Sequence, residues 1–575
     1  MKLMLTEVEK IFKDNIEKIF GKEFSENAGV QYSTRKEFGD FQTNFAMVNS
    51  KKLGKNPREI ATEIIEKFEP NSVIEKMEIA GQGFLNIFIK NSKLNEEIKK
   101  IGSEKYEFPI NTSKKFIIDY SSPNIAKRMH IGHLRSTIIG DSLKKILEYI
   151  GFTVLGDNHI GDWGTQFGKL IVGYNKWIDR EEYEKNPIGE LERIYVKFSE
   201  EAKLDPELEV LAREELRKVQ AGDEININLW KDFIKCSLKE YDKVYKKLDI
   251  KFDLYNGESF YNEMMPGVLE MLKEKGIAVT DNEALVVFFK EEDKLPPCIV
   301  QKKDGSFLYS TSDLATIKYR KDDLDIDTAI YVVDERQKDH FRQVFKIAEM
   351  VGAPYDYEKY HVAFGIMRFE DGVILSSRKG NVVHLIDILE QAKTEARKII
   401  DVKNPSLSEE EKDEIAEVVG IGAIKYFDLS QNRTSAILFS WDKVLNFEGN
   451  TSPYLQYTYA RIMSIFRKLK ENNISYDKDY SLLSDGLNSN ERELATALLK
   501  FPYWIIKSYE GYKPNLIADY LFETAKIFNS FYASESILKE ENKEKFNTRL
   551  MLAEKTAFVI KEGLSLLGIK VVERM

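Results

Sequence analysis

The spacing of hydrophobic residues changes from one segment of the chain to the next, and each spacing predicts a particular element. In residues 8–20, apolar side chains recur every three or four positions, which predicts an amphipathic helix. A second helix is expected from Pro57, because proline is favoured in the first helical turn. Residues 77–89 alternate between apolar and polar and end in GQGFLNIFI, a pattern typical of strands. The pattern thus predicts a small α/β module over residues 1–108.

The middle of the chain begins with a short apolar run at residues 116–118, which predicts a buried strand. A helical pattern follows, and Gly151 is a good stop for it. Further strands are expected at residues 153–156 and 329–333. The apolar positions of the helical pattern are Leu134, Ile138, Leu143, Ile146, Leu147 and Ile150.

The remaining segments are dominated by helical patterns. Residues 194–251 are charged and helical, and their charged faces are most simply solvated surface. Residues 415–426 and 516–531 also have helical spacing, and no strand signal of comparable strength appears near them. The sequence therefore predicts a multidomain α/β protein whose last part is all-α.

Composition narrows the possible functions. The 575 residues suggest roughly three or four domains. The net charge of −10 and a pI near 5.5 argue against a protein that coats nucleic acid through charge alone, although a local basic face could still bind RNA. The chain has only two cysteines, Cys236 and Cys298, so neither a disulfide framework nor a cysteine zinc site is expected. We therefore expect a cytoplasmic location. Neither a signal peptide nor a membrane-spanning run appears.

The most informative polar motif is His130-Ile-Gly-His133, at the junction of the first predicted central strand and its helix. A helix N-terminus exposes backbone N–H groups and the positive end of the helix dipole, which suits a phosphate. Two imidazoles there can donate hydrogen bonds to a nucleotide, and Gly132 leaves room for a base or ribose to approach. The simpler alternative is a helix start that happens to carry two histidines.

The flanking residues favour the nucleotide interpretation. The string SSPNIAKRMHIGHLRSTIIGD (residues 121–141) resembles the HIGH signature of class I aminoacyl-tRNA synthetases, in its arginyl version, and NHIGDWGTQFG (158–168) is also similar. The resemblance implies a Rossmann-type catalytic domain over 109–395, with an insertion at about 173–300. It also implies that residues 1–108 hold the elbow of a tRNA and that residues 396–575 form an anticodon-binding helical bundle.

The implied reaction joins L-arginine to tRNA(Arg) through an arginyl-adenylate, with ATP as a substrate and Mg²⁺ assisting but no tightly bound structural metal. Residues 376–380, SSRKG, resemble the KMSKS loop but lack its lysine pattern, and Lys127 is expected to compensate. His130, His133, Lys127, Arg378 and Lys379 are the predicted catalytic residues, and His130, Gly132, His133, Lys127, Ser376, Ser377 and Lys379 the predicted ATP ligands.

Recognition of arginine requires carboxylates that match a planar guanidinium. Asp119 and Asp313 lie in the two halves of the predicted fold and are expected to converge on one pocket. Tyr309 could form a flat wall of that pocket. Ser312 or Asp313 could alternatively be a helix N-cap. By resemblance, Asn124, His130 and Gln337 would hold the α-amino and carboxylate groups.

Two segments are predicted to contact tRNA. Aromatic and amide side chains can stack on and hydrogen-bond splayed bases, although both segments could equally supply core aromatics and helix contacts. By resemblance, one segment contacts the D-loop, and the other, together with the final residue, contacts the anticodon. The candidates are Phe41, Gln42 and Asn44 in the first module, and Asn450, Tyr454, Gln456, Tyr457 and Met575 in the last.

Three other functions remain open from the sequence. Another class I synthetase, such as the glutamyl type, would need a cationic pocket where this chain has acidic candidates. A small nucleotidyltransferase shares H-x-G-H but is typically far shorter. A tRNA-binding protein without activity would not need Asp119, Asp313 and Gln337 intact. The chain is expected to be a monomer with no membrane contact, while the tRNA identity bases stay open.

Overall fold

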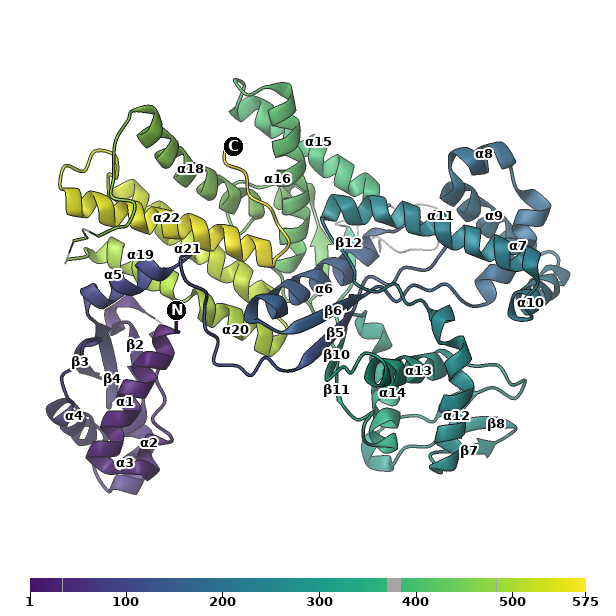
Figure 1. Cartoon of the computed structure of the whole chain (residues 1–575), viewed down its shortest axis with the longest axis horizontal. Helices are drawn as coiled ribbons and strands as arrows, with labels where there is room; N and C mark the ends of the chain where they lie inside the picture. The colour runs from purple at the N-terminus through teal and green to yellow at the C-terminus, as the bar shows by residue number, and fades with distance from the viewer. Residues whose placement is uncertain (34, 370–383, 482, 485) are drawn as a thin grey trace.

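The computed structural model describes residues 1–33, 35–369, 384–481, 483–484 and 486–575 (Figure 1). The N-terminal module lies below the C-terminal helices, and the central sheet connects them to a second group of helices and a small sheet (Figure 1). None of the described helices combines the length and the apolar content that crossing a membrane requires.

The N-terminal module packs helices on an antiparallel sheet of order β1-β2-β4-β3. The predicted alternating segment is a hairpin of two strands, because Gly81 and Gly83 both have positive φ and turn the chain between them. The predicted helix at Pro57 is confirmed, and Asn56 caps it. The elements are α1 (Met4–Phe20), α2 (Lys22–Ser25), β1 (Gln31–Tyr32), β2 (Phe41–Thr43), α3 (Phe45–Leu53), α4 (Pro57–Lys67), β3 (Ile74–Ala80), β4 (Phe84–Ile89) and α5 (Asn91–Lys100).

The central sheet is parallel, with strand order β11-β10-β5-β6, so the predicted α/β fold is confirmed. The predicted strands at 116–118, 153–156 and 329–333 are β5 (Lys115–Asp119), β6 (Thr153–Asp157) and β10 (Thr328–Tyr331), and β11 (Glu358–His361) is the fourth. The predicted helix is α6 (Ile131–Ile150), which ends at Gly151 in a left-handed conformation. Its apolar positions are buried as expected.

The chain between β6 and β10 carries helices followed by a small antiparallel sheet of order β7-β8-β9. These elements are α7 (Thr165–Trp177), α8 (Arg180–Lys185), α9 (Pro187–Glu201), α10 (Glu207–Gln220), α11 (Glu224–Leu248), η2 (Glu258–Met264), α12 (Met265–Glu274), β7 (Ala278–Asp281), β8 (Ala284–Val287), β9 (Cys298–Gln301) and α13 (Tyr309–Asp322). After β10 come η4 (Glu335–Gln337), α14 (Lys338–Val351) and, beyond β11, β12 (Met367–Phe369).

The last part of the chain is helical, as predicted, apart from β13 (Ile437–Phe439), which pairs in parallel with β12. Its helices are α15 (Leu385–Lys403), α16 (Glu409–Leu429), α17 (Trp441–Val444), α18 (Ser452–Glu471), α19 (Ser489–Leu499), α20 (Phe501–Gly511), α21 (Asn515–Ser534) and α22 (Lys543–Leu566). One hydrophobic core runs through the N-terminal module, the central sheet and this bundle.

A buried arginine connects α6 to the bundle. The Arg135 guanidinium is 1% exposed and pairs with the Asp428 carboxylate of α16 at 2.9 Å. It also donates to the carbonyl oxygens of Gly365, Arg433 and Ser435 at 2.6, 3.1 and 3.1 Å. One side chain therefore holds the segments before β12 and β13 against the helix that carries the two histidines.

We predict that Arg135→Met lowers the free energy of unfolding by about 3–5 kcal/mol, because it leaves a buried carboxylate and three carbonyls without their donor. Urea unfolding followed by tryptophan fluorescence measures the change. Lys18→Met, which removes an exposed ion pair with Glu69, is the control and should leave the unfolding midpoint unchanged. Equal midpoints for the two variants would contradict the role of Arg135.

Candidate functional site

Three side chains stand in one row at the carboxyl ends of neighbouring strands. Tyr331 of β10 is paired in register with Asp119 of β5, which is paired with Asp157 of β6. Open parallel sheets bind ligands at this edge. Asp119 and Asp157 both accept a hydrogen bond from Nη2 of Arg320, at 2.7 and 2.8 Å. The predicted substrate ligand Asp119 is therefore already bound to an internal guanidinium, which the sequence analysis did not anticipate.

The two histidines of H-x-G-H lie at the start of α6 in a reciprocal cap. The His130 Nδ1 accepts from the Gly132 backbone N–H at 3.0 Å, and the His133 Nδ1 accepts from the His130 N–H at 3.1 Å. The two ring centroids are 4.0 Å apart. A side chain at position 132 would come within 2.7 Å of His130 Cε1, so Gly132 gives room to this ring.

The cap fixes the protonation of both rings. Each Nδ1 accepts a hydrogen bond from a backbone N–H, so in the neutral ring each Nε2 carries the proton. Burial lowers the pKa of His130, and the neighbouring His384 and Lys127 lower it further. Burial also lowers the pKa of His133 to about 3. Both rings are neutral hydrogen-bond donors at neutral pH.

The helix α13 contributes Tyr309 and Asp313. The predicted N-cap at Ser312 or Asp313 is wrong: α13 begins at Tyr309 after Leu308, and no side chain caps it. Asp313 lies one turn inside, where its Oδ2 is 2.6 Å from Nε2 of His340. Burial opposes a charge on His340, but the bond to Asp313 outweighs it and raises the pKa of His340. Tyr309 is exposed.

Sequence reasoning missed Glu258, the first residue of η2. Burial, together with the Asp162 and Asp313 carboxylates, raises its pKa to about 8. Its charge in turn raises the pKa of Tyr309, after the larger effect of burial. Glu258, Asp313 and Tyr309 therefore form one acidic cluster. Its position directly after Gly257, in a segment without periodicity, was the only local signal.

Asp119 and Asp313 both lie close to one buried ring. The phenol of Tyr331 has a pKa well above its ordinary value, mainly because of burial, and both carboxylates add to the increase. Asp119 is 7% exposed and accepts a further bond from the Ser122 hydroxyl at 3.1 Å. Both acids therefore act electrostatically on Tyr331, and each already has a partner of its own, Arg320 for Asp119 and His340 for Asp313.

The segment before α6 is held by the insertion. The Tyr241 hydroxyl of α11 donates to the carbonyl oxygens of Asn124 and Lys127, at 2.6 and 2.9 Å. The Lys127 ammonium lies 4.8 Å from the ring centroid of Tyr195 on α9. Asn124 and Lys127 are both exposed, as is Gln337, which ends η4 and precedes α14 as predicted. Ser376, Ser377, Arg378 and Lys379 lie outside the described residues.

The predicted tRNA residues of the first module divide into two kinds. The ring of Phe41 is 1% exposed and packs 4.8 Å from Tyr32, so the prediction that it stacks on a base is wrong for this ring as it stands. Phe41 is the first residue of β2, and its side chain lies on the buried face of that strand. Gln42 is half-buried and donates to Asn86 at 2.7 Å, whereas Asn44 is exposed.

The bundle residues divide in the same way. Gln456 is fully buried and donates to the Lys570 carbonyl at 2.8 Å, so the prediction of a direct base contact is also wrong. Tyr457 is 36% exposed, with the Arg461 guanidinium 4.8 Å from its ring. Tyr457, Arg461 and Met575 line a hollow of about 460 Å³. Asn450 is exposed and accepts from Tyr426, and the Tyr454 hydroxyl accepts from Asn529.

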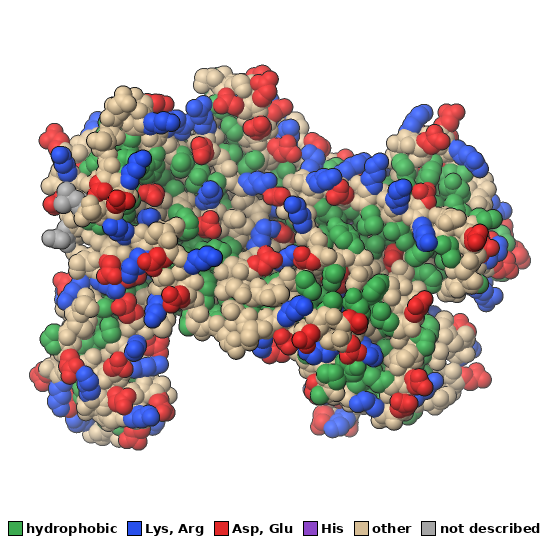
Figure 2. Space-filling model, viewed as in Figure 1, with side chains coloured by type: hydrophobic (Ala, Val, Ile, Leu, Met, Phe, Trp, Pro, Cys, Tyr) green, Lys and Arg blue, Asp and Glu red, His purple; other side chains and the backbone are tan. Residues whose placement is uncertain are grey.

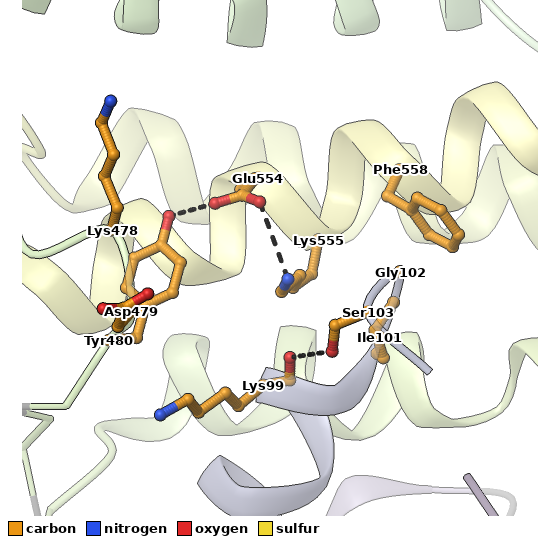
Figure 3. Close-up of a pocket in the computed structure, with 10 residues that line it drawn as sticks. All are labelled: Lys99, Ile101, Gly102, Ser103, Lys478, Asp479, Tyr480, Glu554, Lys555 and Phe558. Carbon is orange, nitrogen blue, oxygen red and sulfur yellow. Dashed lines mark hydrogen bonds and ion pairs between the residues drawn. The ribbon is translucent and has the colours of Figure 1, made fainter. Parts of the chain in front are cut away.

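The surface charge and one further hollow complete the description. Acidic and basic side chains are interspersed over the face in Figure 2, so no single sign of charge dominates it. The hollow in Figure 3 has a volume of about 440 Å³ and lies at the junction of the N-terminal module and α22. Lys99, Lys478 and Lys555 line it, but it contains none of the predicted site residues.

The parallel sheet, with H-x-G-H at the N-terminus of the helix after β5, is the arrangement expected of a class I aminoacyl-tRNA synthetase. The family model described as "tRNA synthetases class I (R), catalytic domain" matches residues 97–441. The "Arginyl tRNA synthetase N terminal domain" matches residues 6–89, and the "DALR anticodon binding domain" matches 455–575. The chain belongs to the arginyl-tRNA synthetase family.

Relatives of known name cover the whole chain. A Fusobacterium nucleatum protein named arginine–tRNA ligase is 55% identical over 576 residues and covers 100% of both chains. A Pasteurella multocida protein of that name is 40% identical and covers 96% of this chain and 99% of its own. The structure of arginyl-tRNA synthetase from Plasmodium falciparum has a TM-score of 0.83 and 30% identity, with full coverage of both chains. The Thermus thermophilus arginyl-tRNA synthetase, at 23% identity and the same TM-score, shares the fold.

We predict that the histidines titrate in a fixed order. His340 should keep its proton to a pH above the ordinary value of 6.5, because Asp313 stabilises the cation. The signals of His133 should not move between pH 5 and 8, because its pKa is about 3. NMR of ring-labelled chain measures this, and single substitutions assign the six histidines. Asp313→Asn should lower the pKa of His340, and titration of His133 near pH 6 would contradict the buried cap.

Proposed function

We propose that the chain is an arginine–tRNA ligase: it activates L-arginine with ATP to arginyl-adenylate and transfers the arginyl group to the 3′-terminal adenosine of tRNA(Arg). The acidic cluster of Glu258, Asp313 and Tyr309 carries this proposal. It lies where η2 packs on α13, the helix whose Arg320 is bonded to Asp119 and Asp157 at the strand ends. An acidic pocket suits a guanidinium, and it excludes the glutamyl alternative. The full-length match excludes the short nucleotidyltransferase.

In the first step, a carboxylate oxygen of arginine attacks the α-phosphorus of ATP, and pyrophosphate leaves. In the second step, a ribose hydroxyl of the tRNA attacks the arginyl carbonyl, and AMP leaves. Such transfers depend mainly on positioning and charge stabilisation. The neutral rings of His130 and His133 would donate hydrogen bonds to the phosphates beside the α6 N-terminus, with Gly132 in the same turn. Lys127, and Arg378 and Lys379, would supply positive charge, and Mg²⁺ would accompany ATP as part of the substrate.

The structure changes which carboxylates we assign to the guanidinium. Asp119 is bound to Arg320, so we assign Glu258 and Asp313 to the substrate guanidinium and Tyr309 to its flat face. Asp119 then suits the α-ammonium group instead, as a carboxylate that retains a narrow exposed edge. Asn124, His130 and Gln337 remain proposed ligands of the α-amino and carboxylate groups, and Ser376, Ser377 and Lys379 of ATP.

For tRNA, we propose that Asn44 and Gln42 contact the D-loop and that Tyr457, Met575, Asn450 and Tyr454 contact the anticodon. The hollow shared by Tyr457, Arg461 and Met575 supports the second contact. We also propose the division into residues 1–108, 109–395 with its insertion at about 173–300, and 396–575. A monomer in the cytoplasm is the proposed state, and the two free thiols agree with that compartment.

Charging of a total tRNA pool with each labelled amino acid, in the presence of ATP, tests the function. Arginine alone should become acid-precipitable, because lysine or citrulline would leave buried acceptors unpaired. His133→Gln should lower the rate with arginine without changing which amino acid is accepted. Preferential charging with any other amino acid would refute the proposal, as would a chain that binds tRNA but charges none of them.

We further predict that the KM for arginine falls as the pH rises toward 8. Glu258 is protonated below its pKa of about 8, so the carboxylate that arginine needs forms only as the proton leaves. The KM should change by up to about tenfold per pH unit below 8 and level off above it. Steady-state aminoacylation with saturating ATP and tRNA measures the profile.

Two variants separate the groups that act in this range. Glu258→Gln should raise the KM for arginine about tenfold or more at pH 8.5 and flatten the profile near pH 8. His340 contributes a change of the same sign at its own pKa, since its cation competes for Asp313, and His340→Gln removes only that part. A wild-type profile that is unchanged in Glu258→Gln would contradict the assignment.

A further inference from the structure

We propose that Arg320 is a positioning residue for arginine recognition: it holds Asp119 in place as the ligand of the substrate ammonium, and it fixes the face of α13 that carries Tyr309 and Asp313. This inference rests on the proposed function of the pocket. Nothing in the local sequence marks Arg320, which lies in a charged stretch near the end of its helix.

The first observation is the bridge itself. The Arg320 side chain is 0% exposed, and a single nitrogen, Nη2, donates to both Asp119 and Asp157. Its guanidinium carbon lies 5.0 Å from the ring centroid of Tyr331. It therefore contacts all three members of the row at the strand ends. Asp119, Asp157 and His159 have ligand atoms within 4.8 Å of one another, as a metal site would, but the Arg320 cation lies between the two carboxylates.

The second observation is that the bridge leaves buried polar atoms without hydrogen bonds, which lowers its contribution to stability. Within the described part of the chain, Arg320 Nε and Nη1 and the Asp157 Oδ1 are buried without a hydrogen-bond partner. Unpaired buried donors and acceptors cost roughly 1–3 kcal/mol each. A residue selected only for packing would not retain this arrangement, which instead points to a role for the charge.

The third observation is the geometry of α13. Asp313 follows Tyr309 by four residues and precedes Arg320 by seven, and these are the spacings of one helix face. Arg320 anchors that face to β5 and β6, while Asp313 lies about two turns and Tyr309 about three turns from it along the helix. Of the two bridged carboxylates, the Asp119 side chain is 10% exposed and that of Asp157 only 1%. Asp119 is thus the one that can reach a ligand.

The charge argument follows from these contacts. Asp119 and Asp157 are neighbours in the register of β5 and β6 and both are buried, so their like charges repel unless a cation contacts both. The pKa of Asp157 is raised, mainly by burial and also by Asp119, although Arg320 acts in the opposite direction. Without Arg320, the repulsion would displace Asp119 from the position in which it can bind the ammonium. Replacing Asp157 by asparagine removes the like charge and should restore that position.

The test measures KM values in aminoacylation with arginine, ATP and tRNA for the full chain. Arg320→Gln should raise the KM for arginine about tenfold or more, as expected for loss of a charged contact, with the KM for ATP within about twofold. Arg320→Gln combined with Asp157→Asn should recover part of the affinity for arginine, and Asp157→Asn alone should change little. Lys318→Gln removes a positive charge from the exposed side of the same helix and should behave as wild type.

Each outcome decides one question. Equal increases in the KM for arginine and for ATP, with no recovery in the double variant, would reduce Arg320 to a structural residue and overturn the proposal. If Arg320→Gln does not fold, Arg320→Lys carries the test: it keeps the positive charge, so the KM for arginine should stay close to the wild-type value, and an increase of about tenfold or more would overturn the proposal. Failure of the wild-type chain to charge tRNA with arginine would instead refute the proposed function.

Discussion

The parallel register of β10, β5 and β6 is the constraint on which the site depends. It places Tyr331, Asp119 and Asp157 side by side at the strand ends, where burial makes two adjacent carboxylates unstable without a cation. The cation is Arg320, and it comes from the helix that also carries Tyr309 and Asp313. The register of the strands sets where Asp119 and Asp157 lie, and the Arg320 bridge to them positions α13. The acidic cluster is therefore held in place relative to H-x-G-H by one ion bridge.

Periodicity was sufficient to predict the frame of this site. The apolar run before Asp119 and the helical spacing after His133 are local signals, and both elements form where they were expected. Arg320 could not be predicted, because its partner Asp119 is 201 residues away and the contact exists only after the sheet closes. Glu258 was missed for the same reason. The pKa of Glu258 is raised by burial and by Asp162 and Asp313, and no short segment of the sequence contains these three acids together.

Errors in the predicted RNA contacts have a different origin. A motif such as Phe-Gly-Asp-Phe-Gln-Thr-Asn shows which groups are present but not which way they point, since successive side chains of a strand face opposite sides. The structure uses Phe41 for the core and Asp40 for attachment: its carboxylate accepts from Arg492 of α19 at 2.5 Å and from the Ile89 N–H at 2.7 Å. Asn44 at the end of the motif is exposed, and Gln42 is half-buried. The motif thus positions the N-terminal module on the bundle, which sets the separation of the two regions proposed to contact tRNA.

The histidine cap limits how the phosphates can be stabilised. The pKa of His133 is about 3, and the pKa of His130 is also below its ordinary value. Neither ring therefore carries a positive charge at neutral pH. The rings and the α6 dipole contribute hydrogen bonds and partial charge, which are weaker than a full cation for a transferring phosphoryl group. Lys127 is the nearest described lysine in sequence to H-x-G-H, and it is exposed but lies against Tyr195 of the insertion. If Lys127 binds a phosphate as proposed, its contact with Tyr195 and the hydrogen bond of its carbonyl oxygen to Tyr241 connect the insertion to the proposed ATP site.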